Sequence, residues 1–433
     1  MRNTQVVVLM GGMGTRLGKY SGNMPKSMAD VHGRPFFDYQ LQLLKSWGFQ
    51  KYLFLVGYRS DAVENYYGDG SSQNIQIAYS HDGKEQLGTG GALRNAAAHL
   101  EDSFLLIYGD SFMDINYLEA IYRFRKGCKN GAAGLMTILR NQNAYDKSNV
   151  LYRKDGCFLY DKKNTTPDMQ YIDYGVSMLQ KSCILSYAQG LAFDIAELLT
   201  LLSKQGRLVP QLVSKRFYEI GRPESLDEFR GYVRRRFLEP AKAVFLDRDG
   251  VINEIVWNED TEQLDSPLKW EEFHYKPKAL EALSILQEKG YLLFIVTNQP
   301  AAAKGKISLE QLYDINTELL EDLKEHGIQV EAVAMCPHHP QGSPHTKETF
   351  LIKNCECRKP KPGLLMKLKE TYCIDWSSSY MVGDSYTDVK AGQAAGLKTV
   401  FLGDYKCDTC ARLDYQKPDH TMKDLAEFAA KAD

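Results

Sequence analysis

Short aliphatic or β-branched runs alternate with amphipathic stretches along the whole chain, and this alternation most constrains the fold. In the first half, Gln5 to Met10 and Phe104 to Tyr108 are expected to be buried strands, and Phe36 to Trp47 has the character of a helix. In the second half, Ala243 to Leu246 and Leu292 to Val296 repeat the strand character. Such alternation predicts βαβ units and largely parallel sheets, and therefore an α/β protein.

The chain is too long for one hydrophobic core. With 433 residues, two or three domains are expected. A helical segment, Ser225 to Arg236, runs into a basic cluster and Pro240 before a new strand begins, which indicates a domain boundary. We predict two domains, residues 1–238 and 239–433.

Charge and hydropathy exclude several classes of partner. The net charge of −2 argues against a broad attraction to nucleic acid or to an anionic membrane. No apolar run is long enough for a membrane span or a signal-peptide core. The protein is therefore expected in the cytoplasm, where thiols stay reduced. Its nine cysteines then favour a metal site over a disulfide framework.

The first candidate site is a glycine-rich loop that directly follows the strand Gln5 to Met10. Gly11, Gly12 and Gly14 allow backbone N–H groups to approach phosphates closely, and Arg16 and Lys26 add cations. The loop lacks the Gly-Lys-Ser/Thr ending of a Walker motif. It also lacks the third glycine of the dinucleotide fingerprint, because position 17 is Leu.

Several ordered motifs together resemble the sugar-1-phosphate nucleotidyltransferases, over roughly residues 5 to 230. They are residues 11–17, Pro25-Lys26-Ser27-Met28 with Gly33-Arg34-Pro35-Phe36, Leu87-Gly88-Thr89-Gly90-Gly91-Ala92-Leu93, and Gly109-Asp110-Ser111. This resemblance implies a Rossmann-like, GT-A-like mixed sheet. It also implies an attack by a sugar-phosphate oxygen on the α-phosphorus of a nucleoside triphosphate. The protein's task in that reaction is alignment and charge neutralisation.

The resemblance also assigns roles to individual residues. The triphosphate would be bound by Gly11, Gly12, Gly14, Thr15, Arg16 and Lys26, with Arg16 and Lys26 as the catalytic cations. The base would be contacted by Gln86, Gly88 and Thr89, the sugar phosphate by Lys162, Asp173 and Gly175, and Mg²⁺ by Asp110 and Glu219. Three departures from the family, Met10, Gln86 and Glu219, leave the base and the metal geometry open.

The second candidate site begins with Asp247 and Asp249, which follow the strand Ala243 to Leu246. Carboxylates two residues apart at a strand's end point the same way, so Asp247 can attack phosphorus while Asp249 protonates the leaving oxygen. The anionic reactants require a cation. We expect Mg²⁺ on Asp247, Asp249 and Asp384 with Asp388 nearby, phosphate contacts from Thr297 and Asn298, and a balancing positive charge on Lys359.

Three cysteines and a histidine predict a zinc site. Cys336, His338, Cys355 and Cys357 supply the four ligands of a closed, structural Zn²⁺ site, with His339 as the alternative imidazole. Such a site would pin a long loop and hold Arg358 and Lys359, two further candidates for contact with the sugar phosphate.

The motifs of the second half resemble the haloacid-dehalogenase phosphatases over about residues 242 to 403, which implies a doubly wound sheet. Asp-Arg-Asp-Gly-x-Ile-Asn and the zinc loop are similar to the heptose 1,7-bisphosphate phosphatases, and histidinol-phosphate phosphatases are close to these. The chain departs from that family at residues 300–305, so substrate specificity stays open.

The two resemblances together suggest consecutive reactions. The second domain would remove the 7-phosphate of a heptose 1,7-bisphosphate, and the first would transfer a nucleotide, with GTP favoured over CTP, ATP or UTP, to the heptose 1-phosphate. The first alternative is another sugar 1-phosphate with a histidinol-phosphate-type phosphatase. The second is a scaffold with one dead site, although Arg16, Asp247, Asp249 and Asp384 are all retained. The anomer and the oligomeric state are left open.

Overall fold

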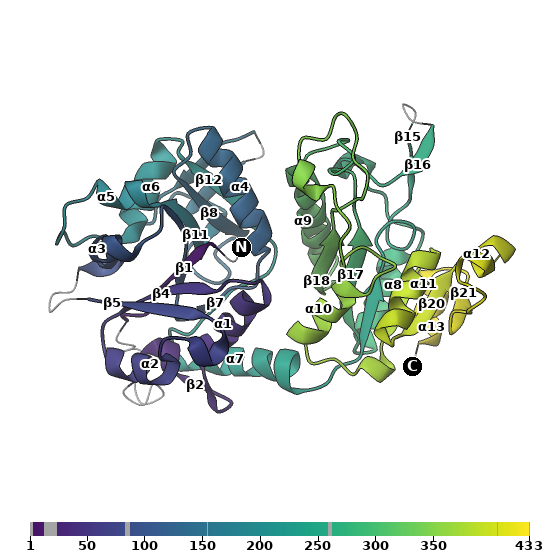
Figure 1. The fold of residues 1–433 in the computed structure, drawn as a ribbon, viewed down its shortest axis with the longest axis horizontal. Coiled ribbons are helices and arrows are strands. Elements are labelled where there is room, and N and C mark those ends of the chain that lie inside the picture. Colours follow the sequence, from purple (N-terminus) through teal and green to yellow (C-terminus); the bar gives the residue numbers. More distant parts are fainter. Residues whose placement is uncertain are drawn as a thin grey trace. The chain divides into compact units, whose positions relative to one another are not determined.

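The computed structural model describes residues 3–12, 24–82, 87–153, 155–258, 262–404 and 406–432. The chain forms two compact units, Met1–Val233 and Arg234–Asp433, each with its own sheet (Figure 1). The predicted organisation as two α/β domains is confirmed. Among the described residues, no helix is both long enough and apolar enough to cross a membrane.

The first unit is built on a mixed sheet. Its strands are β1 (Gln5–Leu9), β2 (Asp30–Val31), β3 (Arg34–Pro35), β4 (Lys51–Val56), β5 (Gln76–His81), β6 (Ser103–Tyr108), β7 (Ser111–Phe112), β8 (Gly134–Arg140), β9 (Val150–Tyr152), β10 (Phe158–Tyr160), β11 (Tyr171–Gln180), β12 (Leu208–Val213) and β13 (Tyr218–Glu219). Its helices are α1 (Phe36–Ser46), α2 (Ser60–Tyr67), α3 (Gly88–Asn95), α4 (Tyr117–Lys129), α5 (Lys181–Leu185), α6 (Ile195–Lys204) and α7 (Pro223–Val233).

Strand β1 lies at the centre of the parallel part of this sheet. It pairs in parallel with β4 on one side and β6 on the other, while β11 pairs antiparallel with β6 and β8. The carboxyl ends of β1 and β6 therefore meet at one edge, so the glycine loop after β1 and Asp110 after β6 lie at the same edge. Apolar residues of α3 and α6, such as Leu93 and Leu199, pack against one face of the sheet.

The second unit is a doubly wound parallel sheet in the order β18-β17-β14-β19-β20-β21. Its strands are β14 (Ala243–Leu246), β15 (Val256–Asn258), β16 (Gln263–Asp265), β17 (Leu292–Asn298), β18 (Val330–Cys336), β19 (Tyr380–Gly383), β20 (Lys398–Leu402) and β21 (His420–Met422). Its helices are α8 (Ala279–Glu288), α9 (Leu309–Glu325), α10 (Gly363–Thr371), α11 (Tyr386–Ala395), α12 (Cys407–Arg412) and α13 (Leu425–Lys431).

Successive side chains of β14 point to opposite faces of the sheet, and each face is covered by different helices. Val244 and Leu246 pack with α8, α9 and α13, whereas Ala243 and Phe245 pack with α10 and α11. Because both faces are buried, the strands are almost continuously apolar. The chain order reverses at β14, with β17 on one side and β19 on the other. In such sheets the ligand site lies beyond the carboxyl ends of the strands at this switch point.

The boundary between the units lies earlier than the predicted boundary at 238/239. Helix α7 ends at Val233, and the next turn is wider and belongs to the second unit. The reason is the burial of Arg236, whose guanidinium lies over the ring of Tyr372 at 4.2 Å. The backbone N–H of Cys373 also donates to the carbonyl oxygen of Arg236 at 2.7 Å.

Candidate active sites

In the first unit, Lys26 and Asp110 meet at the carboxyl edge of the sheet. Lys26 Nζ donates to Asp110 Oδ2 at 2.9 Å, and both side chains are largely shielded from solvent. Gly109, which precedes Asp110, has little space for a side chain. A Cβ there would lie 2.9 Å from Met10 Cγ and 3.1 Å from the carbonyl oxygen of Leu9. The glycine thus lets the turn after β6 lie against the end of β1.

Glu219 reaches the same place through strand pairing. The short strands β7 and β13 are antiparallel with Glu219 opposite Ser111, and Ile220 N–H donates to the carbonyl oxygen of Asp110 at 3.0 Å. Burial raises the pKa of Tyr108 far above its usual value, and the negative charges of Asp173, Asp194, Asp110 and Glu219 raise it further. Four carboxylates therefore lie close enough to Tyr108 for their charges to act on its phenol.

The predicted sugar-side residues occupy one region. Asp173 Oδ1 accepts the N–H of Gly175 at 2.9 Å, and Gly175 has a φ of +93°, which favours glycine. Burial raises the pKa of Asp173 to about 6, while Gly175 and the charge of Lys162 act in the opposite direction. Lys162 Nζ lies 4.0 Å from Asp194 Oδ2 and is 60% exposed, so it is available to an anionic ligand.

The residues predicted to contact the nucleotide base pack against the segment before α6. A Cβ at Gly88 would lie 2.7 Å from the carbonyl oxygen of Phe193, and one at Gly90 would lie 2.2 Å from the Phe193 ring. The hydroxyl of Thr89 donates to Asp194 Oδ1 at 3.1 Å and accepts the N–H of Ile195 at 2.9 Å. The Thr89 side chain therefore fixes the turn in place. Gly14, Thr15, Arg16 and Gln86 lie outside the described residues.

Gly11 and Gly12 differ in their surroundings. A Cβ at Gly11 would lie 2.7 Å from Asp82 Oδ2, whereas one at Gly12 would meet none of the described residues within 4 Å. The backbone of Gly11 therefore lies close to the side chain of Asp82.

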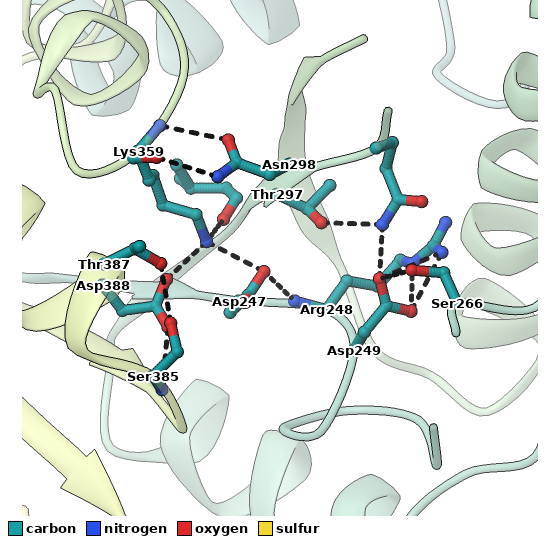
Figure 2. A network of polar contacts seen from close by, with 12 residues as sticks. Asp247, Arg248, Asp249, Ser266, Thr297, Asn298, Lys359, Ser385, Thr387 and Asp388 are labelled. Carbon is teal, nitrogen blue, oxygen red and sulfur yellow. Dashed lines mark hydrogen bonds and ion pairs between the residues drawn. The ribbon is translucent and has the colours of Figure 1, made fainter. Parts of the chain in front are cut away.

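In the second unit, a buried lysine joins the two parts of the phosphatase motif. Lys359 Nζ lies 2.9 Å from Asp247 Oδ1 and 2.6 Å from Asp388 Oδ1, and it donates to the carbonyl oxygen of Val296 at 2.6 Å. Figure 2 shows this ammonium group between the two carboxylates. The backbone of Lys359 is held by Asn298, whose side chain donates to the Lys359 carbonyl oxygen and accepts from the Lys359 N–H.

Three carboxylates of this site converge on one point. One oxygen from each of Asp247, Asp384 and Asp388 lies within 4.8 Å of the others, an arrangement that could hold a metal ion. Gly250 has a φ of +82°, and a Cβ there would lie 1.9 Å from Asp384 Oδ2, so only glycine leaves space for that carboxylate. The other oxygen of Asp388 accepts from Ser385 at the start of α11, which fixes its direction.

The crowding of carboxylates alters their acidity. Burial raises the pKa of Asp247, and the charges of Asp388 and Asp249 add to this, while Lys359 lowers it. Burial likewise raises the pKa of Asp384 to about 6, with Asp388 adding to the effect. A single lysine therefore does not balance the carboxylates. A bound cation would remove this repulsion.

The carboxylate of Asp249 is not part of the group formed by Asp247, Asp384 and Asp388, and its role as a metal ligand stays a prediction. Its side chain accepts from Arg248, Asn253 Nδ2 at 2.9 Å, Ser266 Oγ at 2.8 Å and Gln299 Nε2 at 2.5 Å. Burial raises the pKa of the Asp249 carboxyl group. The charge of Arg248 and these hydrogen bonds lower it by more, so this pKa lies below its usual value. These contacts stabilise the ionised form of the carboxyl group.

Two predicted phosphate contacts have protein partners. The hydroxyl of Thr297 accepts from Gln299 Nε2 at 2.9 Å and is fully buried. The amide of Asn298 is used to position Lys359, as described above. The sequence did not single out Arg248, Asn253, Ser266 or Gln299. Arg248 and Asn253 could have been found only because they lie within the aspartate motif. Gln299 could have been found only because it follows Thr297 and Asn298.

The cysteine cluster forms as predicted, with His338 and not His339. The Sγ atoms of Cys336, Cys355 and Cys357 lie 3.2–3.6 Å apart, far beyond a disulfide bond, and His338 Nδ1 lies 3.2 Å from Cys357 Sγ. The ring of His339 is instead engaged by the backbone of Gln341.

The cysteine cluster is connected to neighbouring loops. Arg358 Nη1 donates to the carbonyl oxygen of His338 at 3.2 Å, which ties the cluster to the segment that carries Lys359. The unusual segment 300–305 is attached as well. Ser343 Oγ donates to the carbonyl oxygen of Lys304, and Thr346 Oγ1 to that of Ala303. Residues 303 and 304 are therefore tied to the segment between the two halves of the cysteine cluster.

The doubly wound sheet carries two aspartates and a buried lysine at its switch point, an arrangement that suits a phosphatase. Two family models match the chain: nucleotidyl transferase over residues 5–146 and HAD-hydrolase-like over residues 356–428. The chain is thus an enzyme with two active regions.

Curated relatives define the family. D-glycero-alpha-D-manno-heptose-1,7-bisphosphate 7-phosphatase of Photorhabdus laumondii is 37% identical over 161 residues, covering 37% of this chain and 81% of that protein. D-glycero-beta-D-manno-heptose-1,7-bisphosphate 7-phosphatase of Rhodopseudomonas palustris is 36% identical over 155 residues, covering 36% and 79%. The chain belongs to the family of the heptose-1,7-bisphosphate 7-phosphatases.

One solved structure similar to the chain is HddC from Yersinia pseudotuberculosis complexed with GMP-PN. It is 23% identical, covers 53% of this chain and 99% of that chain, and has a TM-score of 0.43.

Proposed function

We propose that the chain catalyses two consecutive steps in the synthesis of a nucleotide-activated heptose. The second unit hydrolyses the 7-phosphate of D-glycero-D-manno-heptose 1,7-bisphosphate. The first unit transfers a nucleotidyl group from a nucleoside triphosphate, with GTP favoured, to heptose 1-phosphate and releases pyrophosphate. The observation that carries the proposal is the buried Asp247–Lys359–Asp388 group in a member of the 7-phosphatase family. The first product is then the kind of sugar 1-phosphate that a nucleotidyltransferase consumes.

In the phosphatase step, Asp247 attacks the phosphorus of the 7-phosphate and the bond to the sugar oxygen breaks. Asp249 gives a proton to that oxygen, so that a neutral hydroxyl leaves. The phosphate dianion beside Asp249 favours the protonated form of this residue before the transfer. Water then attacks the phosphorus of the aspartyl phosphate, Asp249 takes up a proton from the water, and inorganic phosphate departs. Lys359 holds Asp247 in position throughout.

The donor atoms fit the metals that these reactions need. Asp247, Asp384 and Asp388 would hold Mg²⁺ in the second unit. Asp110 would hold Mg²⁺ in the first, together with Glu219, whose strand pairs with the strand that follows Asp110. The bound Mg²⁺ would neutralise phosphate charge. Three sulfur atoms and one imidazole nitrogen, all within 4.8 Å of one another, suit Zn²⁺ in a structural role. These thiolates stay available in a reducing compartment, which supports a cytoplasmic location.

In the nucleotidyl transfer, Lys26 and Arg16 would neutralise the triphosphate while backbone groups of Gly11 and Gly12 approach it. Lys162 would hold the phosphate of the sugar, and Asp173 would accept hydrogen bonds from sugar hydroxyls. The exposed ammonium of Lys162, beside the carboxylates of Asp173 and Asp194, supports this division of roles. The sugar-phosphate oxygen attacks the α-phosphorus, and pyrophosphate leaves.

The two half-reactions are tested separately. Phosphate release is measured with heptose 1,7-bisphosphate and with histidinol phosphate, and pyrophosphate release with heptose 1-phosphate and each of GTP, CTP, ATP and UTP. We expect phosphate from the heptose bisphosphate and pyrophosphate with GTP. Phosphate from histidinol phosphate alone would overturn the heptose assignment, and pyrophosphate with another triphosphate would overturn the choice of base.

A further inference from the structure

Arg248, the residue between the two aspartates, is the largest fully buried side chain of the described residues. Its guanidinium donates to Asp249 Oδ1 through Nε at 3.2 Å and through Nη2 at 3.0 Å. Nη1 points the other way and donates to Asn316 Oδ1 on α9 at 3.0 Å. The arginine is thus anchored to a helix of the scaffold at one end and to Asp249 at the other.

The contact with Asp249 constrains orientation as well as charge. Nη2 also lies 3.3 Å from the second carboxylate oxygen, so the planar guanidinium faces both oxygens of the carboxyl group. Figure 2 shows Asp249 directed toward Arg248 and Ser266, on the side away from Lys359. A lysine could supply the charge at this place, but it lacks the planar arrangement of donors.

We propose that Arg248 is a positioning residue for the proton transfer to the leaving oxygen, because it fixes the plane of the Asp249 carboxyl group on the rigid frame of α9. The inference rests on the proposed phosphatase function. In the step concerned, Asp247 forms a bond to phosphorus, the bond from phosphorus to the sugar oxygen breaks, and the Asp249 proton moves to that oxygen. Arg248 itself does not touch the substrate and acts only through the carboxyl group of Asp249.

The proposal predicts a dependence on the leaving group. A sugar alkoxide is strongly basic and needs the proton of Asp249 to leave, whereas p-nitrophenolate is stable without one. A variant with a misplaced Asp249 should therefore lose more activity on the sugar phosphate than on p-nitrophenyl phosphate. A general loss of structure would reduce both rates by the same factor.

The test uses Arg248→Lys in the full-length protein and measures kcat/KM for both substrates. This ratio reports the steps up to departure of the leaving group and excludes the later hydrolysis of the aspartyl phosphate. Arg236→Lys is the matched control, since Arg236 is also a buried arginine of the second unit, with Nε donating to the carbonyl oxygen of Thr371. Asn316→Leu is the second variant, because it loosens the anchor of Arg248 and leaves the arginine in place.

We expect Arg248→Lys to lower kcat/KM at least tenfold more for heptose 1,7-bisphosphate than for p-nitrophenyl phosphate. Asn316→Leu should shift the ratio in the same direction by a smaller factor, and Arg236→Lys should leave it unchanged. Equal losses on both substrates in Arg248→Lys and in Asn316→Leu would overturn the proposal. If Arg248→Lys does not fold, an unchanged ratio in Asn316→Leu overturns it alone. If the wild-type protein hydrolyses neither substrate, the proposed phosphatase function itself is refuted.

Discussion

The two candidate active sites differ in how their charged groups are held. In the second unit, Lys359, Asp388 and Arg248 are buried, and each makes several contacts with other residues of the site. In the described part of the first unit, the charged groups differ in exposure: Lys26 and Asp110 are largely shielded and form one ion pair, whereas Lys162 is 60% exposed.

This difference corresponds to the chemistry proposed for each site. A covalent nucleophile and a proton donor must be fixed within a fraction of an ångström, whereas the transfer of a nucleotide depends on neutralising and aligning two large anionic substrates. A rigid network suits the first task. Exposed charged side chains such as Lys162 suit the second.

The largest expected effect separates the two sites completely. Asp247→Asn removes the nucleophile, so phosphate release should fall roughly 10⁴-fold or more. Nucleotidyl transfer to supplied heptose 1-phosphate should stay within a factor of two of the wild-type rate, since the two sites lie in different units. The measurement is phosphate and pyrophosphate release by the same preparation. Loss of both activities would show that the sites are coupled.

The converse variant should affect the first site alone. Asp110→Asn removes a carboxylate proposed to hold Mg²⁺ and leaves Lys26 without its ion pair. A loss of several kcal/mol of charge stabilisation corresponds to a fall in pyrophosphate release on the order of 10²–10³-fold. Asp227→Asn, a surface carboxylate of the same unit, is the control. A fall of less than tenfold in Asp110→Asn would exclude the metal role.

Removal of the cysteine cluster should weaken the second unit. Cys355→Ser should release the loop that is joined to Arg358 and to residues 303–304. The thermal midpoint of this unit should drop by roughly 5–10 °C if about 2–3 kcal/mol is lost. Phosphatase activity should fall with it, and nucleotidyl transfer should not. Cys410→Ser is the matched control, and bound zinc is measured by elemental analysis. Equal zinc content in both variants would contradict the assignment of the ligands.

The smallest effect concerns Asp173 and pH. Its folded-state pKa of about 6 lies above the unfolded value of about 3.9, so burial disfavours the ionised form. The favourable contribution is full below pH 4 and is lost as the pH rises through 6. Asp173→Asn should therefore match the wild-type thermal midpoint near pH 4 and exceed it near pH 8. A difference between the two proteins that does not change with pH would contradict the raised pKa.

The sequence was informative where one strand and the turn after it determine the site. Asp247 follows β14, Thr297 closes β17 and Asp384 follows β19, so the parallel register alone brings them to one edge. The spacing of Cys336, His338, Cys355 and Cys357 also indicated that these four side chains would lie together. In these cases, the prediction needs only the local geometry of the strand and its turn and the alternation of side chains along the strand.

The sequence was less informative where a contact depends on packing between distant segments. Asn298 holds the backbone of Lys359, 61 positions away, and Arg248 reaches Asn316 across the sheet edge. The separation of the Asp249 carboxylate from the metal cluster results from Ser266 and Gln299, which come from other elements. The position of Glu219 beside Asp110 likewise depends on the pairing of two very short strands.

The most direct test of the two-step account is a single reaction that contains heptose 1,7-bisphosphate, Mg²⁺ and one nucleoside triphosphate, analysed by mass spectrometry for sugar nucleotide. We predict that the wild-type protein forms a nucleotide-activated heptose with GTP. Asp247→Asn should form none, and addition of heptose 1-phosphate should restore product formation by that variant. Release of phosphate without a sugar nucleotide from any of the four triphosphates would contradict the account.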